Sequence, residues 1–153
     1  MRKIWAFNYG ERPDGIGIHA DLAAVNVNFW ITPDSANLDP ERGGLVVWDK
    51  EAPLAWDFQI YNKDEARIRA FLADSAARPY RIPYRCNRAV IFNSDLFHET
   101  DRLRFKPGYE NRRINVTMLY GLRAARARRP ALASEADLKS AGGTDRGEPR
   151  QGR

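Results

Sequence analysis

The residues most able to do chemistry are the only two histidines among 153 residues, His19 and His98. His19 stands two positions before Asp21, so in a strand both side chains project from one face and can reach one metal ion. His98 would arrive from a distant segment and complete a set of two imidazoles and one carboxylate. Such a set leaves coordination positions open and suits non-haem iron(II) chemistry with oxygen.

Each half of this pattern also has a purely structural interpretation. A His-x-Asp tripeptide is often a surface pair or a hydrogen bond at a strand edge. A single histidine in an apolar stretch, such as Leu96-Phe97-His98, is usually a core or rim residue. Taken separately, neither histidine predicts a metal site.

A third feature of the sequence favours the interpretation as a metal site. In the segment 113–117, Arg113, Asn115 and Thr117 alternate with apolar residues and share one face of a predicted strand. A buried guanidinium stays charged, so it needs an anion, and a bidentate carboxylate would suit it. The alternatives are an arginine at the strand entry with its head in solvent, and a competing role for Arg112.

The elements that must position these residues are mostly short strands separated by turns. Alternation and turn residues predict strands at 4–9, 15–21, 25–31, 44–48, 80–84, 88–92, 97–105 and 112–120. The last two are expected to pair as a hairpin. One helix is predicted at about 64–76, with Asn62 as its N-cap. Short strands at this spacing favour an antiparallel barrel or jelly roll.

Composition predicts one soluble domain followed by a tail. The formal net charge is +5, but residues 122–153 hold eight basic and four acidic residues, a net of +4. This tail has few large apolar side chains and is predicted to be mostly disordered. Most of the excess positive charge therefore lies outside the body, 1–121, and a nucleic-acid partner is not expected. The sequence shows no membrane span, no signal-peptide core and a single cysteine, which together predict a cytoplasmic protein.

Three stretches, 15–21, 25–34 and 88–101, together with the strand that contains Arg113, resemble the Fe(II)/2-oxoglutarate-dependent dioxygenase superfamily. The similarity is to its prolyl-hydroxylase-like and phytanoyl-CoA-hydroxylase-like members, in an uncharacterised bacterial branch, and covers about residues 4–121. The resemblance implies a double-stranded β-helix, a cupin-like jelly roll, in which His19, Asp21 and His98 hold Fe(II). It implies a hydroxylase that couples decarboxylation of 2-oxoglutarate to C–H oxidation by O2 of a small-molecule or peptidyl substrate.

The resemblance also suggests roles around the metal. Arg113 would bind the far carboxylate of 2-oxoglutarate, and Tyr9 and Asn115 could hydrogen-bond this cosubstrate. Asn26 and Asn28 would line the cavity or brace a metal ligand, although a solvated outer face is an equal alternative.

Two departures from the superfamily pattern leave other functions open. His98 and Arg113 are 15 positions apart, which is longer than usual, and only 18 residues precede His19, so the N-terminal buttress is expected to be short or missing. One alternative is a cupin-like metalloprotein that does not use 2-oxoglutarate. Another is a non-catalytic remnant or binding module.

Overall fold

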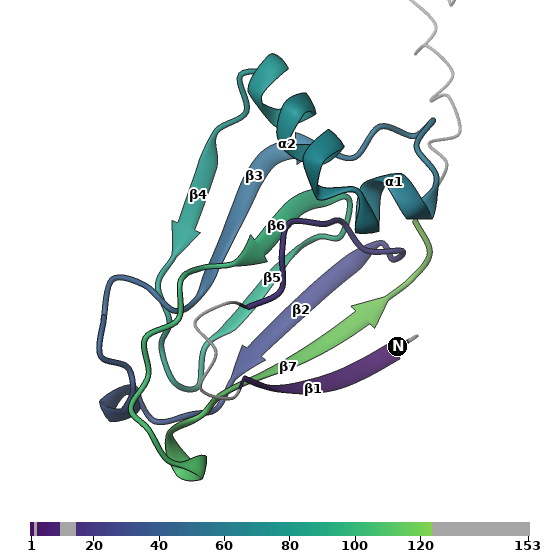
Figure 1. Ribbon diagram of the computed structural model, residues 1–153. Coiled ribbons are helices and arrows are strands. Elements are labelled where there is room, and N and C mark those ends of the chain that lie inside the picture. Colours follow the sequence, from purple (N-terminus) through teal and green to yellow (C-terminus); the bar gives the residue numbers. More distant parts are fainter. Residues whose placement is uncertain (2, 10–14, 124–153) are drawn as a thin grey trace, which may run out of the picture.

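Two antiparallel sheets make up most of the computed structural model, which describes residues 1, 3–9 and 15–123 (Figure 1). The four-stranded sheet has the order β1 (Lys3–Tyr9), β7 (Arg113–Tyr120), β2 (Val25–Trp30) and β5 (Ala89–Asn93). The three-stranded sheet has the order β4 (Pro79–Ile82), β3 (Leu45–Glu51) and β6 (Leu96–Thr100). This confirms the predicted mainly β fold of the jelly-roll type. Of the predicted disordered tail, 124–153 lies outside the described residues.

The inner face of the larger sheet is polar. In β2 the buried residues are Asn26, Asn28 and Trp30, whereas Val25 is 37% exposed. β7 alternates in the same way, and its buried side starts at Arg113. Strands usually turn apolar side chains toward the core, so this inverted pattern indicates a polar cavity between the sheets.

Two consecutive helices cover one end of the fold (Figure 1). The predicted helix is present as α2 (Glu65–Asp74), preceded by a shorter α1 (Phe58–Lys63) that was not predicted. Asn62 is not the N-cap of α2, because Asp64 accepts a hydrogen bond from the Arg67 backbone N–H and takes that role. The helices cover an apolar cluster made of Ile18, Ala20, Ala52, Tyr61, Ile68, Leu72 and Phe97.

The predicted strand at 15–21 is not a regular strand. This segment runs beside β6 and forms one isolated bridge, between His19 and His98. It is also tied to α1, because the Ala20 backbone N–H donates to Tyr61 O and Asn62 Nδ2 donates to Ala20 O. Hydrogen bonds to β6 on one side and to α1 on the other therefore hold this segment in place of a continuous strand ladder.

The predicted hairpin of 97–105 with 112–120 is wrong. β6 pairs with β3, whereas β7 lies between β1 and β2 in the other sheet. The connection does not turn back, because its backbone bonds to the segment around η1 (Asp34–Ala36). Leu38 N donates to Arg104 O, and Lys106 N donates to Ala36 O. After these contacts, η2 (Tyr109–Asn111) leads the chain into β7.

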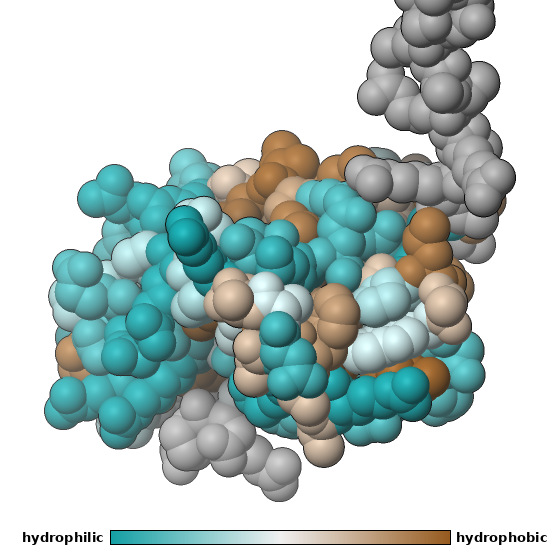
Figure 2. Space-filling model, turned by 90° about the horizontal axis from the view of Figure 1, so that it is seen from above, coloured by the Kyte–Doolittle hydropathy of each residue, from teal (hydrophilic) through white to brown (hydrophobic). Residues whose placement is uncertain are grey.

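The face seen in Figure 2 is mainly hydrophilic, and its hydrophobic side chains gather in separate groups. No helix within the described residues is long and apolar enough to cross a membrane.

Candidate metal centre

His19 and His98 are brought together by backbone pairing. Each donates its backbone N–H to the carbonyl of the other, with N···O distances of 3.0 and 2.9 Å. Directly opposed residues of an antiparallel pair project to the same face. The two imidazole rings therefore meet, with centroids 4.4 Å apart.

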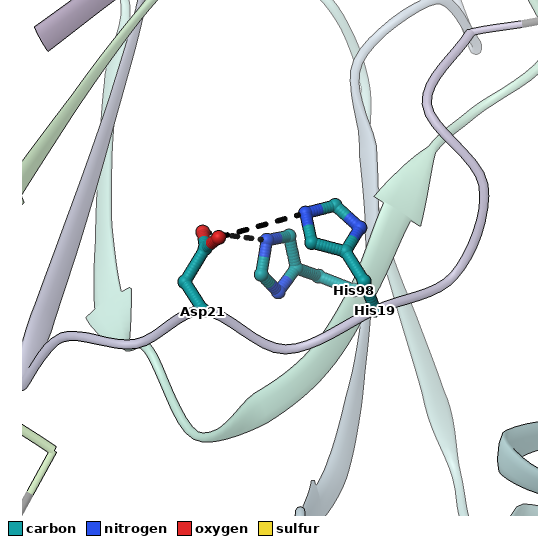
Figure 3. A group of neighbouring side chains, drawn as sticks. All are labelled: His19, Asp21 and His98. Carbon is teal, nitrogen blue, oxygen red and sulfur yellow. Dashed lines mark ion pairs between the residues drawn. The ribbon is translucent and has the colours of Figure 1, made fainter. Parts of the chain in front are cut away.

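Asp21 turns its carboxylate toward both rings (Figure 3). Its Oδ1 lies 3.9 Å from His19 Nε2, and its Oδ2 lies 3.5 Å from His98 Nε2. All three ligand atoms lie within 4.8 Å of one another. The structure thus brings together the three residues singled out from the sequence, in a grouping that could hold a metal ion.

The outer ring nitrogens of both histidines are occupied by backbone carbonyls. His19 Nδ1 lies 2.7 Å from Gly17 O, and His98 Nδ1 lies 2.9 Å from Leu96 O. A carbonyl only accepts, so Nδ1 of each ring carries a proton, and Nε2 is the nitrogen whose lone pair can bind a metal. Both lone pairs belong to the atoms nearest Asp21.

Electrostatics keep His19 and Asp21 in a ligating protonation state. Burial, together with the nearby His98, lowers the pKa of His19 to about 4. Burial acts to raise the pKa of Asp21, but the hydrogen bond and charge of His98 outweigh it, and the pKa lies below its ordinary value. At neutral pH the site therefore offers a neutral His19 and an ionised Asp21.

A network of amides supports the carboxylate from the inner face of the larger sheet. Asn26 Nδ2 donates to Asp21 Oδ2 at 2.7 Å, and Asn28 Nδ2 donates to Asn26 Oδ1 at 2.6 Å. Asn28 Oδ1 in turn accepts from Asn115 Nδ2 and Thr117 Oγ1. The alternative of a solvated outer face is therefore wrong for Asn26 and Asn28, which are 0% and 3% exposed.

A cavity of about 790 Å³ opens beside the three residues. Its lining includes the metal-centre residues, the amide network and Tyr9, but not Arg113 or Arg112. A volume of this size is typical of small-molecule sites. The cavity could therefore hold an organic ligand next to the metal centre.

Arg113 is 1% exposed and lies one layer behind the cavity wall. Its Nε donates to Gly43 O at 2.7 Å and its Nη2 to Gly44 O at 3.3 Å. The guanidinium carbon lies 4.8 Å from the ring centroid of Tyr9, which does line the cavity. Burial lowers the pKa of Arg113, although an arginine keeps its charge at neutral pH.

This guanidinium has no acidic partner among the described residues, and its Nη1 has no hydrogen-bond partner there. Arg112, the competing candidate, instead places its guanidinium 5.3 Å from the Tyr109 ring centroid, away from the cavity. Arg113 is therefore the arginine that shares the inner face with Asn115, as the alternation predicted.

Several cavity residues were not singled out from the sequence. Thr100 is near Tyr9, with 3.4 Å between Oγ1 and the tyrosine hydroxyl. Lys3, Trp5 and Phe7 line the cavity together with Tyr9, and they occupy alternate positions of β1. Alternation in 3–9 could have indicated this shared face, but the place of β1 at the edge of the described sheet could not be known from it.

Comparison with known proteins gives a structural likeness only. No protein-family model and no curated protein matches the sequence. Among solved structures, two of an N-substituted L-amino acid dioxygenase from Burkholderia ambifaria AMMD are similar, one of them in complex with alpha-KG. Both have a TM-score of 0.44 and 12% identity, and they cover 75% and 76% of this chain. The chain spans about half of their length, 47% in each case.

Proposed function

We propose that this protein is a non-haem Fe(II)/2-oxoglutarate-dependent oxygenase that hydroxylates a small-molecule or peptidyl substrate. The observation that carries the proposal is the convergence of His19 Nε2, His98 Nε2 and the Asp21 carboxylate within 4.8 Å. Two imidazoles and one carboxylate form the donor set typical of iron(II) oxygenases.

The residues present fit such a metal. Both Nδ1 atoms are bonded to backbone carbonyls, so neither ring needs to change tautomer to ligate. Within the described part of the chain, no fourth His, Cys, Asp or Glu joins the group. A structural zinc site would have four protein ligands, whereas a set of three leaves positions for cosubstrate and oxygen.

Each residue would have a defined task. His19, Asp21 and His98 would bind the iron, while Asn26 holds the Asp21 carboxylate in place through its 2.7 Å hydrogen bond. Bound iron(II), together with O2 and 2-oxoglutarate, would supply oxidising chemistry that side chains cannot supply. The protein positions the reactants and excludes water around them.

Arg113 supports the use of a dicarboxylate. A buried guanidinium without an acidic partner among the described residues is costly, and an arriving carboxylate would relieve that cost. The ring of Tyr9 lies both over the guanidinium and against the cavity, so it must turn aside for direct contact. Its hydroxyl and Asn115, which also line the cavity, would then bind the same cosubstrate.

One observation favours the second candidate function, a metalloprotein that does not use 2-oxoglutarate. Arg113 does not line the cavity, and backbone carbonyls and aromatic rings already surround its guanidinium. The Arg113→Ala variant separates the two functions. Loss of 2-oxoglutarate binding with metal binding retained supports the oxygenase, and unchanged 2-oxoglutarate binding contradicts the assignment of Arg113.

The decisive test is anaerobic titration with Fe(II) and 2-oxoglutarate. We expect a weak visible metal-to-ligand charge-transfer band in the wild type and none in His98→Ala. Asp21→Asn, which keeps the side-chain shape, serves as a second variant if His98→Ala does not fold. A well-folded wild type without the band would contradict the proposed function.

A further inference from the structure

One wall of the cavity is formed by β1, the edge strand of the larger sheet among the described residues. Trp5, Phe7 and Tyr9 occupy alternate positions and lie on the same side, with successive ring centroids 6.4 and 6.2 Å apart. Lys3 continues this row, with Nζ 5.6 Å from the Trp5 ring centroid. All four side chains line the cavity, and we call Lys3, Trp5 and Phe7 the β1 wall.

Strand register places the β1 wall close to the metal centre. Lys3 pairs with Leu119 on β7, and Leu119 pairs with Asn26 on β2. Lys3 is therefore two strand spacings, roughly 10 Å, from the residue whose amide holds Asp21. A molecule that lies against the wall can extend its far end to the metal centre.

Large aromatic side chains of the cavity lining, both in the β1 wall and outside it, stay partly exposed. Phe58, at the start of α1, lines the cavity and is 41% exposed, and Trp5 is 38% exposed. Large aromatic side chains that stay partly exposed in a cavity gain free energy when an apolar ligand covers them. The lining therefore favours a ligand with an aromatic or extended apolar body.

The unbalanced charge of the cavity lining is positive. Lys3 and Lys63 both line it, and neither forms an ion pair with a described residue. Of the acidic residues in the lining, Glu65 pairs with Arg69, whose Nη2 lies 2.7 Å away, which leaves only the Asp21 carboxylate against the two lysines. A ligand with an anionic group therefore fits better than a cationic one.

We infer that the β1 wall binds the organic substrate, and that this substrate is a carboxylate with an aromatic or extended apolar body. This inference rests on the proposed function, because it names the substrate of that same site. The rings of Trp5 and Phe7 contact the apolar body, and Lys3 attracts the carboxylate. The β1 wall determines specificity, and the iron-binding residues remain separate from it.

The test is titration of the metal-free full chain with 3-phenylpropionate, followed by ligand-observed NMR. Leaving the metal out prevents the probe carboxylate from ligating it. We expect the anion to bind and the matched cation, 3-phenylpropylamine, not to bind. Trp5→Ala and Lys3→Gln should each weaken binding about fivefold or more, while Trp5→Phe retains it.

Ile4→Ala is the matched control, because Ile4 is 53% exposed and occupies the opposite face of β1. Equal weakening in Ile4→Ala and Trp5→Ala, or preference for the amine, would overturn the inference. The same preparation is titrated with Fe(II) and 2-oxoglutarate. A charge-transfer band without binding of 3-phenylpropionate overturns the inference and leaves the oxygenase standing. Trp5-dependent binding without the band retains the ligand site but overturns its role as a substrate site.

Discussion

His19 and His98 are a directly opposed antiparallel pair that exchanges both backbone hydrogen bonds, at 3.0 and 2.9 Å. The same pairing that docks residues 15–21 on β6 also sets the distance between the two imidazoles. Metal binding and the docking of this segment are therefore coupled, because either one alone favours the geometry that the other needs.

Removal of the amide that braces Asp21 should weaken metal binding. Asn26→Ala removes the 2.7 Å hydrogen bond to Asp21 Oδ2, and we expect affinity for Fe(II) or Co(II) to fall about 10- to 100-fold. Isothermal titration under anaerobic conditions measures this change. Asn93→Ala is the control, since Asn93 is exposed and bonds to Glu51. Equal affinities in both variants would show that Asn26 does not support the site.

The stability of the metal-free protein should fall as the solution becomes acidic. Folded His19 has a pKa of about 4, against an ordinary value of 6.5, so between these values the unfolded chain binds more protons. The free energy of unfolding therefore decreases from pH 6.5 to pH 4, by an amount on the order of 3 kcal/mol. Because the pKa of Asp21 is lowered in the folded protein, the contribution of Asp21 to the free energy of unfolding is lost at still lower pH.

Urea unfolding between pH 7 and pH 4, with a chelator present, measures this dependence. His19→Gln should flatten the curve over that interval. A wild-type curve that is already flat there would contradict the lowered pKa of His19.

Binding of 2-oxoglutarate should stabilise the Zn(II)-loaded protein only when Arg113 is present. At 100 times its dissociation constant, a ligand adds about 2.7 kcal/mol to the free energy of unfolding. We expect Arg113→Met to lose this increase, because the apolar side chain fills the space without the charge. Arg112→Met is the control and should respond like the wild type. Thermal melting with and without 2-oxoglutarate measures the difference, and a full response in Arg113→Met would contradict the role of Arg113.

Gly44→Ala should destabilise the fold around the arginine. A Cβ at Gly44 would lie 1.9 Å from Ile82 O and 2.9 Å from Tyr84 N, both of which are backbone atoms. We expect a loss of about 2 kcal/mol or more in chemical denaturation. In the control Gly17→Ala, the nearest atom is the end of the Glu65 side chain at 3.0 Å, which can move. Similar losses in the two variants would rule out this steric cause.

Local pattern was sufficient to identify most of the strands and the chemistry of the donor set. Alternation placed Arg113, Asn115 and Thr117 on one face, and all three are buried on the inner side of β7. The scarcity of histidine made His19 and His98 the obvious ligand candidates. These features depend on side-chain type and on the two-residue period of a strand, both of which can be read from the chain itself.

Only the tertiary structure decided which segments meet. The predicted hairpin failed because backbone groups of Arg104 and Lys106 bond to a distant segment and carry the chain to the other sheet. Non-local hydrogen bonds of this kind leave no periodic trace in the sequence. For the same reason, the β1 wall could not be predicted, nor could the enclosure of Arg113 by Tyr9, Gly43 and Gly44. Both depend on strand order and packing rather than on local pattern.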